Sequence, residues 1–242
     1  VTFGDQTTPG VEIILPDPEF IREYAKNIVG IVLTHAHEDH IGAVAWLWPQ
    51  LRAPLYATPF TAFLLREKLR ENDECADAEI TEVPLSGTIQ LGPFEVELIT
   101  LTHSIPEPNG LAIRTPLGTV LHTGDWKIDP DPVLGSVTDD AAIQKLGDEG
   151  VLAMVCDSTN AFNADDSGSE GSVKADLLKS VKEAKGRVLL TTFASNAARL
   201  QTMGEVARET GRTLCFAGRS LHRIIDAAQA NAGAAQAASD AV

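Results

Sequence analysis

Seven consecutive residues, Thr34-His35-Ala36-His37-Glu38-Asp39-His40, place three imidazoles and two carboxylates in one short stretch. Neutral imidazole and carboxylate are, with thiolate, the usual protein ligands of zinc. His35 and His37 are two residues apart, so both point the same way if they end a strand. Asp39 and His40 follow where the chain turns into a helix. We therefore expect His35 and His37 to bind one cation, and Asp39 and His40 to bind a second.

Two later residues complete this predicted metal centre. His103 follows the apolar stretch 96–101, and Asp125 follows the stretch 119–122 through Gly124, which lets the backbone turn closely. A carboxylate at position 125 can bridge two cations and offset their repulsion. Paired cations lower the pKa of bound water from about 15.7 towards about 7, which makes hydroxide available as a nucleophile.

The other polar residues near this cluster have more ordinary interpretations. An isolated histidine usually binds no metal. His122 could equally be a metal ligand or a residue that packs beside a ligand and holds it in place. We expect His222 to lie on the surface of a helix, and Glu38 to point away from the ligands. Thr34 is expected to hydrogen-bond a ligand carboxylate.

The cluster follows a continuous apolar and β-branched stretch, residues 28–33, which is typical of a strand buried on both faces. A helix is predicted over residues 41–48, with Pro49 as its stop. Further strands and one more helix are predicted before residue 160. These are strands at 54–57, 88–91, 94–100, 110–114, 119–122 and 151–156, and a helix at 60–70.

The character of the sequence changes after residue 160. Residues 161–172 are rich in Asn, Asp, Ser and Gly and predict a loop. Alternating helix and strand then predict a parallel α/β unit. We therefore divide the chain into domains 1–160 and 161–242. The predicted elements are helices at 172–185, 195–209 and from 220, and strands at 188–192 and 213–216.

Composition gives weaker evidence about the partners and the location of the protein. The net charge is −15, with 9 basic against 25 acidic residues in 1–160 but 10 against 9 in 161–242. This distribution is explained equally well by a solvated acidic surface and by a second part that can bind phosphate. No membrane span or signal peptide is expected. Because Val1 is not a start methionine, we expect the chain to begin inside a longer protein. Cys156 and Cys215 lie in apolar stretches and are interpreted as buried thiols, which favours the cytoplasm.

The ordered motifs resemble those of ribonuclease J, a family in the β-CASP branch of the metallo-β-lactamase superfamily. The resemblance extends over nearly the whole chain. The motifs are His35-Ala-His37-Glu-Asp39-His40-Ile-Gly, Thr102-His103-Ser104-Ile105-Pro106, His122-Thr123-Gly124-Asp125-Trp126-Lys127, Cys156-Asp157-Ser158-Thr159-Asn160, Thr192-Phe193-Ala194-Ser195-Asn196 with Arg199, and Gly218-Arg219-Ser220.

This resemblance implies an α/β protein, a metallo-β-lactamase αββα sandwich with part of a β-CASP α/β domain. It implies an RNA-processing nuclease, with ribosomal RNA among its substrates, that trims RNA from the 5′ end and also cuts internally. It implies two divalent ions, zinc or alternatively manganese, and a homo-oligomer for full-length members. The first ion would be bound by His35, His37 and His103, and the second by Asp39, His40 and the bridging Asp125.

The resemblance also assigns residues in the later motifs. Asp157 matches an acidic β-CASP motif and is expected to be catalytic with Asp39 and Asp125. Ser195 and Asn196 match a segment that contacts RNA phosphate, with Arg199 beside it. Independently, backbone amides at a helix start can receive an anion; Ser195 is equally well explained as a helix cap. Arg219 is a further phosphate candidate or a solvated side chain.

Compared with the family, the chain is expected to be a truncated form. The first strands, the rest of the β-CASP domain and two further histidines are expected to be missing, which leaves the second metal with three protein ligands. Two alternatives therefore remain beside the ribonuclease. One is another hydrolase on the same scaffold, such as a β-lactamase or lactonase, and the other is a non-catalytic RNA-binding fragment.

Overall fold

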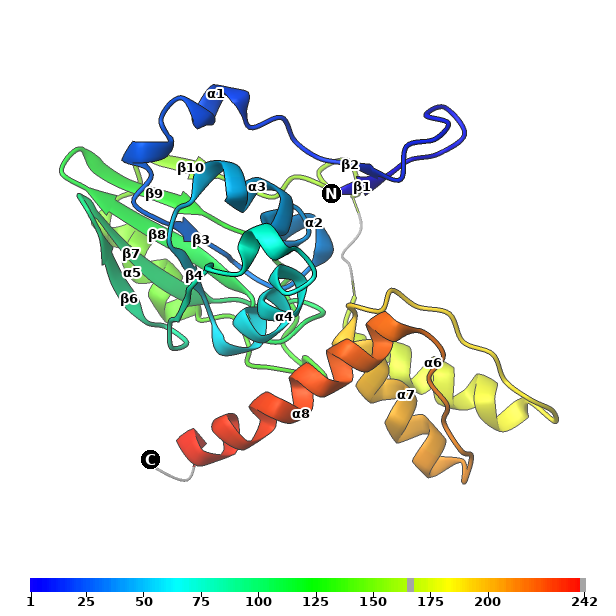
Figure 1. Ribbon diagram of the computed structural model, residues 1–242. Helices are drawn as coiled ribbons and strands as arrows, with labels where there is room; N and C mark the ends of the chain where they lie inside the picture. The colour runs from blue at the N-terminus through cyan, green and yellow to red at the C-terminus, as the bar shows by residue number, and fades with distance from the viewer. Residues whose placement is uncertain (165–167, 240–242) are drawn as a thin grey trace.

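Two β-sheets form the centre of the computed structural model, which describes residues 1–164 and 168–239 (Figure 1). One sheet has three parallel strands in the order β3-β4-β5, and the other has five in the order β10-β9-β8-β7-β6. A separate two-stranded hairpin pairs β1 with β2. The strands are β1 (Thr2–Phe3), β2 (Ile13–Ile14), β3 (Ile31–Val32), β4 (Leu55–Ala57), β5 (Ile80–Glu82), β6 (Thr88–Leu91), β7 (Phe94–Thr100), β8 (Asn109–Thr115), β9 (Gly118–His122) and β10 (Ala153–Val155).

Helices cover the outer faces of both sheets and also make up the second part of the chain. In the five-stranded sheet, β6 to β9 are antiparallel neighbours in chain order, whereas β10 runs parallel to β9 after the crossover through α5. The helices are α1 (Glu19–Arg22), α2 (Glu38–Ile41), α3 (Val44–Leu51), α4 (Pro59–Leu69), α5 (Asp140–Glu149), α6 (Glu170–Glu183), α7 (Ala197–Glu209) and α8 (Arg219–Ser239), with short 3₁₀ turns η1 (Ala25–Asn27) and η2 (Asp73–Cys75).

The three-stranded sheet is apolar on both faces. Leu55 and Ala57 of β4 belong to a core cluster with helices α3 and α4, while Tyr56 between them packs towards the other sheet. This alternation follows from the two-residue period of a strand, whose successive side chains point to opposite faces. It explains why the stretch before the histidine cluster is continuously apolar.

The five-stranded sheet shows the same alternation. Leu98 and Leu111 pack into the core between the sheets, whereas Ile99 and Ala112 pack against Leu146 of α5 on the outer face. The layers are therefore helices, sheet, sheet and helix. The predicted αββα sandwich is confirmed.

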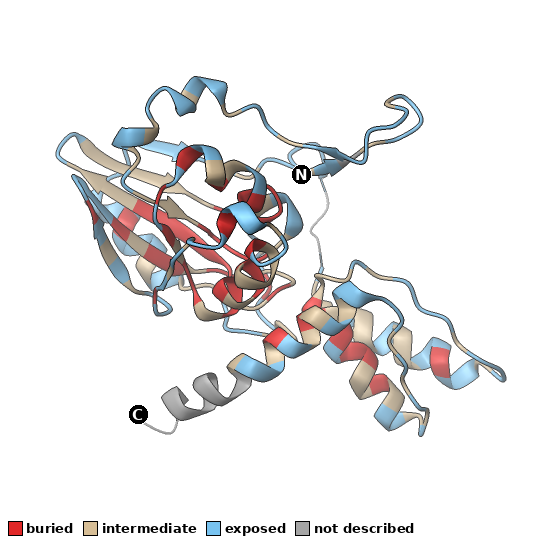
Figure 2. Ribbon diagram, in the orientation of Figure 1, coloured by how far each residue is buried: buried red, intermediate tan, exposed pale blue. Residues whose placement is uncertain are grey.

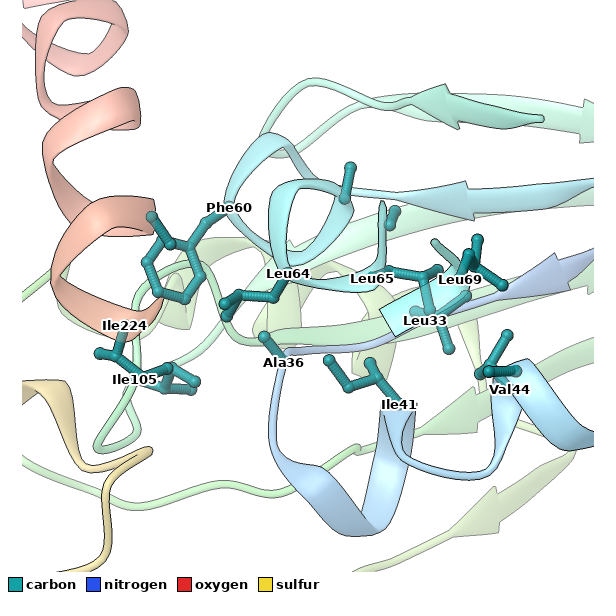
Figure 3. Packing of buried hydrophobic residues seen from close by; sticks show 14 of the residues in the cluster. Leu33, Ala36, Ile41, Val44, Phe60, Leu64, Leu65, Leu69, Ile105 and Ile224 are labelled. Atoms are coloured by element: carbon teal, nitrogen blue, oxygen red, sulfur yellow. The ribbon is translucent and has the colours of Figure 1, made fainter. Parts of the chain in front are cut away.

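Helices α7 and α8 share the core of the sandwich. Ile224 of α8 belongs to the same buried cluster as Phe60 of α4 and Ile105 from the loop after β7, and Figure 3 shows these three side chains side by side. Leu200 and Met203 of α7 belong to it as well. Apolar packing thus holds the second part of the chain against the end of the sandwich where the predicted metal ligands lie.

Pro49 was predicted to stop a helix, and this prediction is wrong. Helix α3 continues through Pro49 to Leu51 and ends at Arg52, which adopts a left-handed conformation with φ of 51°. Proline has no N–H to donate to the carbonyl of Ala45, four residues earlier. That carbonyl instead accepts hydrogen bonds from Asn72 Nδ2 at 2.7 Å and from Cys75 Sγ at 3.3 Å. The replacement donors allow the helix to continue.

The stretch 151–156 was predicted to be a buried strand, and its burial is contradicted. Only its middle residues, Ala153–Val155, form β10, and all six residues are exposed in the part of the chain that the structure describes (Figure 2). Cys156 and Cys215 are also exposed, and only Cys75 is a buried thiol. Apolar composition predicts what a strand can bury, but the strand also needs a covering layer.

The two strands predicted in the second part are not formed among the described residues. Residues 188–192 and 213–216 have no ladder partner, and Leu189 is 87% exposed. The three predicted helices there are present as α6, α7 and α8. A helix completes its hydrogen bonds locally, whereas a strand requires a neighbour. Among the described residues no helix is both long enough and apolar enough to cross a membrane.

Replacing Asn72 tests how the Pro49 helix is stabilised. In Asn72→Ala the Ala45 carbonyl loses its closest donor, so we expect the free energy of unfolding to fall by about 1–3 kcal/mol, measured by urea denaturation. The control is Asn163→Ala, which removes only an exposed hydrogen bond to Asn160. Equal losses in the two variants would contradict this explanation.

Candidate metal centre

The predicted ligands come from the ends of strands in both sheets. His35 follows β3 of the three-stranded sheet, while His103 and Asp125 follow β7 and β9 of the other. The carbonyl of Thr34 accepts hydrogen bonds from the backbone N–H of Asn109 at 3.1 Å and from its Nδ2 at 3.2 Å. Asn109 begins β8, so it fastens the end of β3 to the second sheet. This link brings the ligand-bearing segments together.

The first ligand group contains His35, His37, His103 and Asp125. His37 Nδ1 lies 3.1 Å from His35 Nε2 and 3.0 Å from His103 Nε2. Oδ2 of Asp125 lies 3.8 Å from Nε2 of both His35 and His103. His35 is fully buried, so this group lies at the inner end of the site.

The second ligand group contains Asp39, His40 and again Asp125. His40 Nε2 lies 3.1 Å from Asp125 Oδ1 and 3.6 Å from Asp39 Oδ2. The single turn of α2 brings both residues here, since the His37 carbonyl accepts the amide of His40 at 3.1 Å. Asp125 therefore presents one carboxylate oxygen to each group, which is the geometry of a bridging ligand.

The chemistry of the first group fits a divalent cation. Tetrahedral zinc with ligands at its usual bond length separates the ligand atoms by about 3.4 Å, and the measured separations of 3.0 to 3.8 Å lie around this value. His37 Nδ1 faces two ring nitrogens at once, although one nitrogen can share a proton with only one of them. A cation would satisfy all three lone pairs.

The electrostatics of the site keep its inner imidazoles neutral. Burial, followed by neighbouring histidines, lowers the pKa of His35 to about 2 and that of His37 to about 4. Burial also lowers the pKa of His103. For His40, burial is outweighed by the hydrogen bond and charge of Asp125, so its pKa is raised. Metal binding requires neutral imidazole, and His35, His37 and His103 meet this requirement.

The turn that carries Asp125 depends on Gly124. Gly124 has φ of +57°, and a Cβ at this position would lie 2.7 Å from the carbonyl oxygen of Asn109. Its amide donates to Nδ1 of His122 at 3.0 Å. His122 lies in neither ligand group, so it supports the turn, one of the two alternatives left open above.

Thr34 was predicted to hydrogen-bond a ligand carboxylate, but its hydroxyl lies against two histidines instead. Its hydroxyl lies 3.1 Å from Nδ1 of His35 and 3.5 Å from Nδ1 of His40. Glu38 points away from the ligands, as predicted, and pairs with Lys68 at 2.7 Å. His222 is exposed, as predicted.

Asp157 lies near both ligand groups but in neither of them. Its carboxylate accepts hydrogen bonds from the amide and the hydroxyl of Thr159 at 2.9 and 2.6 Å. Its amide donates to Thr123 Oγ1 at 3.0 Å, which holds the end of β10 beside the Asp125 turn. The negative charge of Asp157 raises the pKa of His40, after the larger effects of burial, Asp125 and Asp39.

The segment predicted to contact phosphate lies at the start of α7. Asn196, rather than Ser195, is the helix cap, because its Oδ1 accepts the amide of Arg199 at 2.8 Å. The Arg199 guanidinium pairs with Glu170 at 3.1 Å. The amide of Ala198 donates to the carbonyl of Ser104 at 3.2 Å, one residue after His103. This helix start is therefore joined directly to the metal-centre loop.

Two polar contacts at the site were not anticipated. Ser104 Oγ lies 3.4 Å from Nε2 of His37, and Asp129 Oδ2 accepts the amide of Glu170 at the start of α6. Ser104 directly follows His103 in the sequence, so its position was a usable signal. Asp129 lies 41 residues from its partner in the sequence, and no local sequence pattern predicts this contact.

Comparison with known proteins identifies the family to which this fold belongs. The metallo-β-lactamase superfamily model matches residues 4–184. The chain belongs to the metallo-β-lactamase superfamily. A model of the ribonuclease J β-CASP domain matches residues 185–241, which confirms the resemblance drawn from the motifs. The two matches meet at residues 184 and 185, and the division at residue 160 stays a prediction.

Curated relatives are similar over nearly the whole chain. A ribonuclease J of Sinorhizobium meliloti is 47% identical over 95% of the chain, and one of Corynebacterium glutamicum is 42% identical over 95%. The chain spans only 41% and 32% of the lengths of these two relatives. A crystal structure of an Enterococcus faecalis protein of unknown function matches 76% of this chain and 45% of that one. Its TM-score is 0.58 at 18% identity, a likeness of fold alone.

Replacing Gly124 tests the turn beside Asp125. Gly124→Ala places an alanine in the left-handed backbone region and brings its Cβ too close to the Asn109 carbonyl oxygen. Backbone strain alone costs about 1–3 kcal/mol, so we expect the free energy of unfolding to fall by more than this. Metal stoichiometry, measured by elemental analysis after dialysis, should also fall. The control is Gly135→Ala, with φ of +80° and no described residue within 4 Å of the new Cβ. Equal effects of the two variants would contradict the role given to this close contact.

Asp129 provides a test by pH. Burial alone would raise its pKa, but hydrogen bonds from the Glu170 amide and the Ser169 hydroxyl outweigh this, and the pKa is lowered from its ordinary 3.8. A lowered carboxyl pKa contributes stability that is present above the ordinary value and is lost as pH falls through the lowered one. The difference in unfolding free energy between wild type and Asp129→Ala should therefore shrink in acid.

Urea unfolding between pH 7 and pH 3 measures this difference. The control is Asp131→Ala, because the Asp131 side chain is exposed. A difference between wild type and Asp129→Ala that stays constant over this range would show that the carboxylate is not responsible.

Proposed function

We propose that this chain carries the metal centre of a metal-dependent ribonuclease, whose substrate is RNA and whose cofactors are two divalent ions. The observation that carries the proposal is the position of Asp125, which offers one oxygen to each of two ligand groups. The proposal is also supported by the similarity to ribonuclease J relatives over 95% of the chain.

Each ligand group has a distinct task in the proposal. His35, His37 and His103 bind the first ion with Asp125, and their nitrogen-rich set favours zinc, with manganese as the alternative. Asp39 and His40 bind the second ion with the other oxygen of Asp125. When bound, two divalent ions lower the pKa of water towards neutrality and stabilise negative charge on a phosphodiester. Asp39 and Asp125 offset the repulsion between the ions.

RNA is proposed to approach from the side of α7. Ser195, Asn196 and Arg199 contact its phosphates through their side chains. The amides of Ala197, Ala198 and Arg199 already donate to the Ser195 carbonyl, the Ser104 carbonyl and Asn196 Oδ1. Because the Asn196 oxygen caps the helix, its NH₂ group is the part that donates to phosphate. Arg199 is paired with Glu170, so it contacts RNA only by exchanging or sharing that partner.

Asp157 is proposed as a third catalytic carboxylate beside Asp39 and Asp125. Its contacts with Thr159 hold it at the edge of the centre, where its charge acts on His40. Hydrolysis is proposed to proceed both from the 5′ end and internally, as the resemblance implies. A cytoplasmic location and a homo-oligomeric full-length protein are further parts of the proposal.

Substrate choice tests the function directly. With zinc or manganese, the chain should shorten a 5′-monophosphorylated RNA and leave a chromogenic β-lactam intact, as followed by gel electrophoresis and absorbance. Turnover of the lactam alone would favour another hydrolase on this scaffold. RNA affinity that falls with salt, without cleavage, would favour a non-catalytic RNA-binding piece.

The two-ion centre has its own test. Asp39→Ala should reduce the metal content from two ions to one and abolish nearly all hydrolysis. The remaining ligands, His40 and one carboxylate oxygen of Asp125, cannot balance the charge of the second ion. Elemental analysis and the RNA assay measure both effects. The adjacent Glu38→Ala, which removes only the pair with Lys68, should keep two ions. If Asp39→Ala retains both ions and full activity, the ligand assignment is wrong.

A further inference from the structure

Thr34 occupies a position between the two ligand groups. It is 6% exposed, and its carbonyl is held by both the backbone and the side chain of Asn109. Its side chain lies against the Asp125 turn, since a Cβ on Gly124 would lie 3.3 Å from Thr34 Cβ and 3.5 Å from its methyl carbon. The backbone and the methyl group together set the direction of the hydroxyl.

The hydroxyl faces one histidine from each ligand group. Its oxygen lies 3.1 Å from Nδ1 of His35 and 3.5 Å from Nδ1 of His40. The opposite nitrogens of these rings face Asp125, with His35 Nε2 towards Oδ2 and His40 Nε2 towards Oδ1. Both rings are therefore held between the same threonine and the same aspartate.

The tautomers follow from this arrangement. An imidazole that offers the lone pair of Nε2 to a cation carries its proton on Nδ1. His35 and His40 then both direct an N–H group at the Thr34 oxygen. A hydroxyl oxygen has two lone pairs and can accept both hydrogen bonds while donating its own proton elsewhere.

We infer that the Thr34 hydroxyl orients a ligand of each metal site at once and thereby couples the binding of the two ions. This inference rests on the proposed two-metal centre. Thr34 acts as a positioning residue, because its hydroxyl lies against the rings of His35 and His40 and it belongs to neither ligand group. A first ion that takes the Nε2 lone pair of His35 leaves its proton on Nδ1, facing one lone pair of the Thr34 oxygen. The other lone pair then accepts the Nδ1–H of His40, which is the tautomer that the second site needs.

Thr34→Val tests the inference, because valine keeps the shape of threonine and removes the hydroxyl. In a calorimetric zinc titration of the full chain, we expect both sites to weaken by about 10–100-fold. Thr34→Ser should recover most of the affinity. The matched control is Thr202→Val, since Thr202 is buried and its hydroxyl has no hydrogen-bond partner among the described residues. That variant should bind zinc as wild type does.

A second readout reports the tautomers themselves. In ¹H–¹⁵N spectra of the zinc-loaded chain, the Nδ1–H signals of both His35 and His40 should shift in Thr34→Val and not in Thr202→Val. Unchanged affinities at both sites, or loss confined to one site, would overturn the coupling. If wild type binds no zinc, the proposed function itself fails. If wild type binds two ions and Thr34→Val binds them equally well, only this inference fails.

Discussion

The arrangement of the site depends on one carboxylate that serves two groups of donors. Asp125 can face His35 with one oxygen and His40 with the other only if the ends of β3 and β9, which belong to different sheets, lie within a side chain's reach. Imidazole nitrogens that face one another gain little without a cation between them. The fold therefore has to supply the energy that holds them together, and apolar burial between the layers is its main source.

Several features of the sandwich serve this one requirement. The core between the sheets sets their separation, and the two hydrogen bonds from Asn109 to the Thr34 carbonyl set their relative position at the ligand end. Gly124 permits the close approach that a side chain would block. Each feature is structural by itself, yet together they determine where the ligand atoms lie.

The helices beyond residue 160 are tied to the same end of the molecule. Ser104 connects His37 to the start of α7 through its hydroxyl and its carbonyl, and Asp129 holds the start of α6. A ligand that moved the start of α7 would therefore also move the loop that carries His103, through the Ala198–Ser104 hydrogen bond. Contact at the start of α7 and the position of the ligand His103 are therefore physically linked.

The sequence by itself determined the features that local chemistry encodes. The histidine cluster, the alternating strands 88–122 and the helices α4, α6 and α7 are all visible as residue types at a fixed period, since ligand spacing, strand alternation and helix hydrogen bonds are local. Only the tertiary structure decided which partner each group meets. It gave Thr34 two imidazoles instead of a carboxylate, gave the Ala45 carbonyl new donors at Pro49, left β10 exposed, and left 188–192 without a neighbouring strand. These outcomes depend on contacts between residues far apart in sequence, and apolar or polar character alone does not specify such partners.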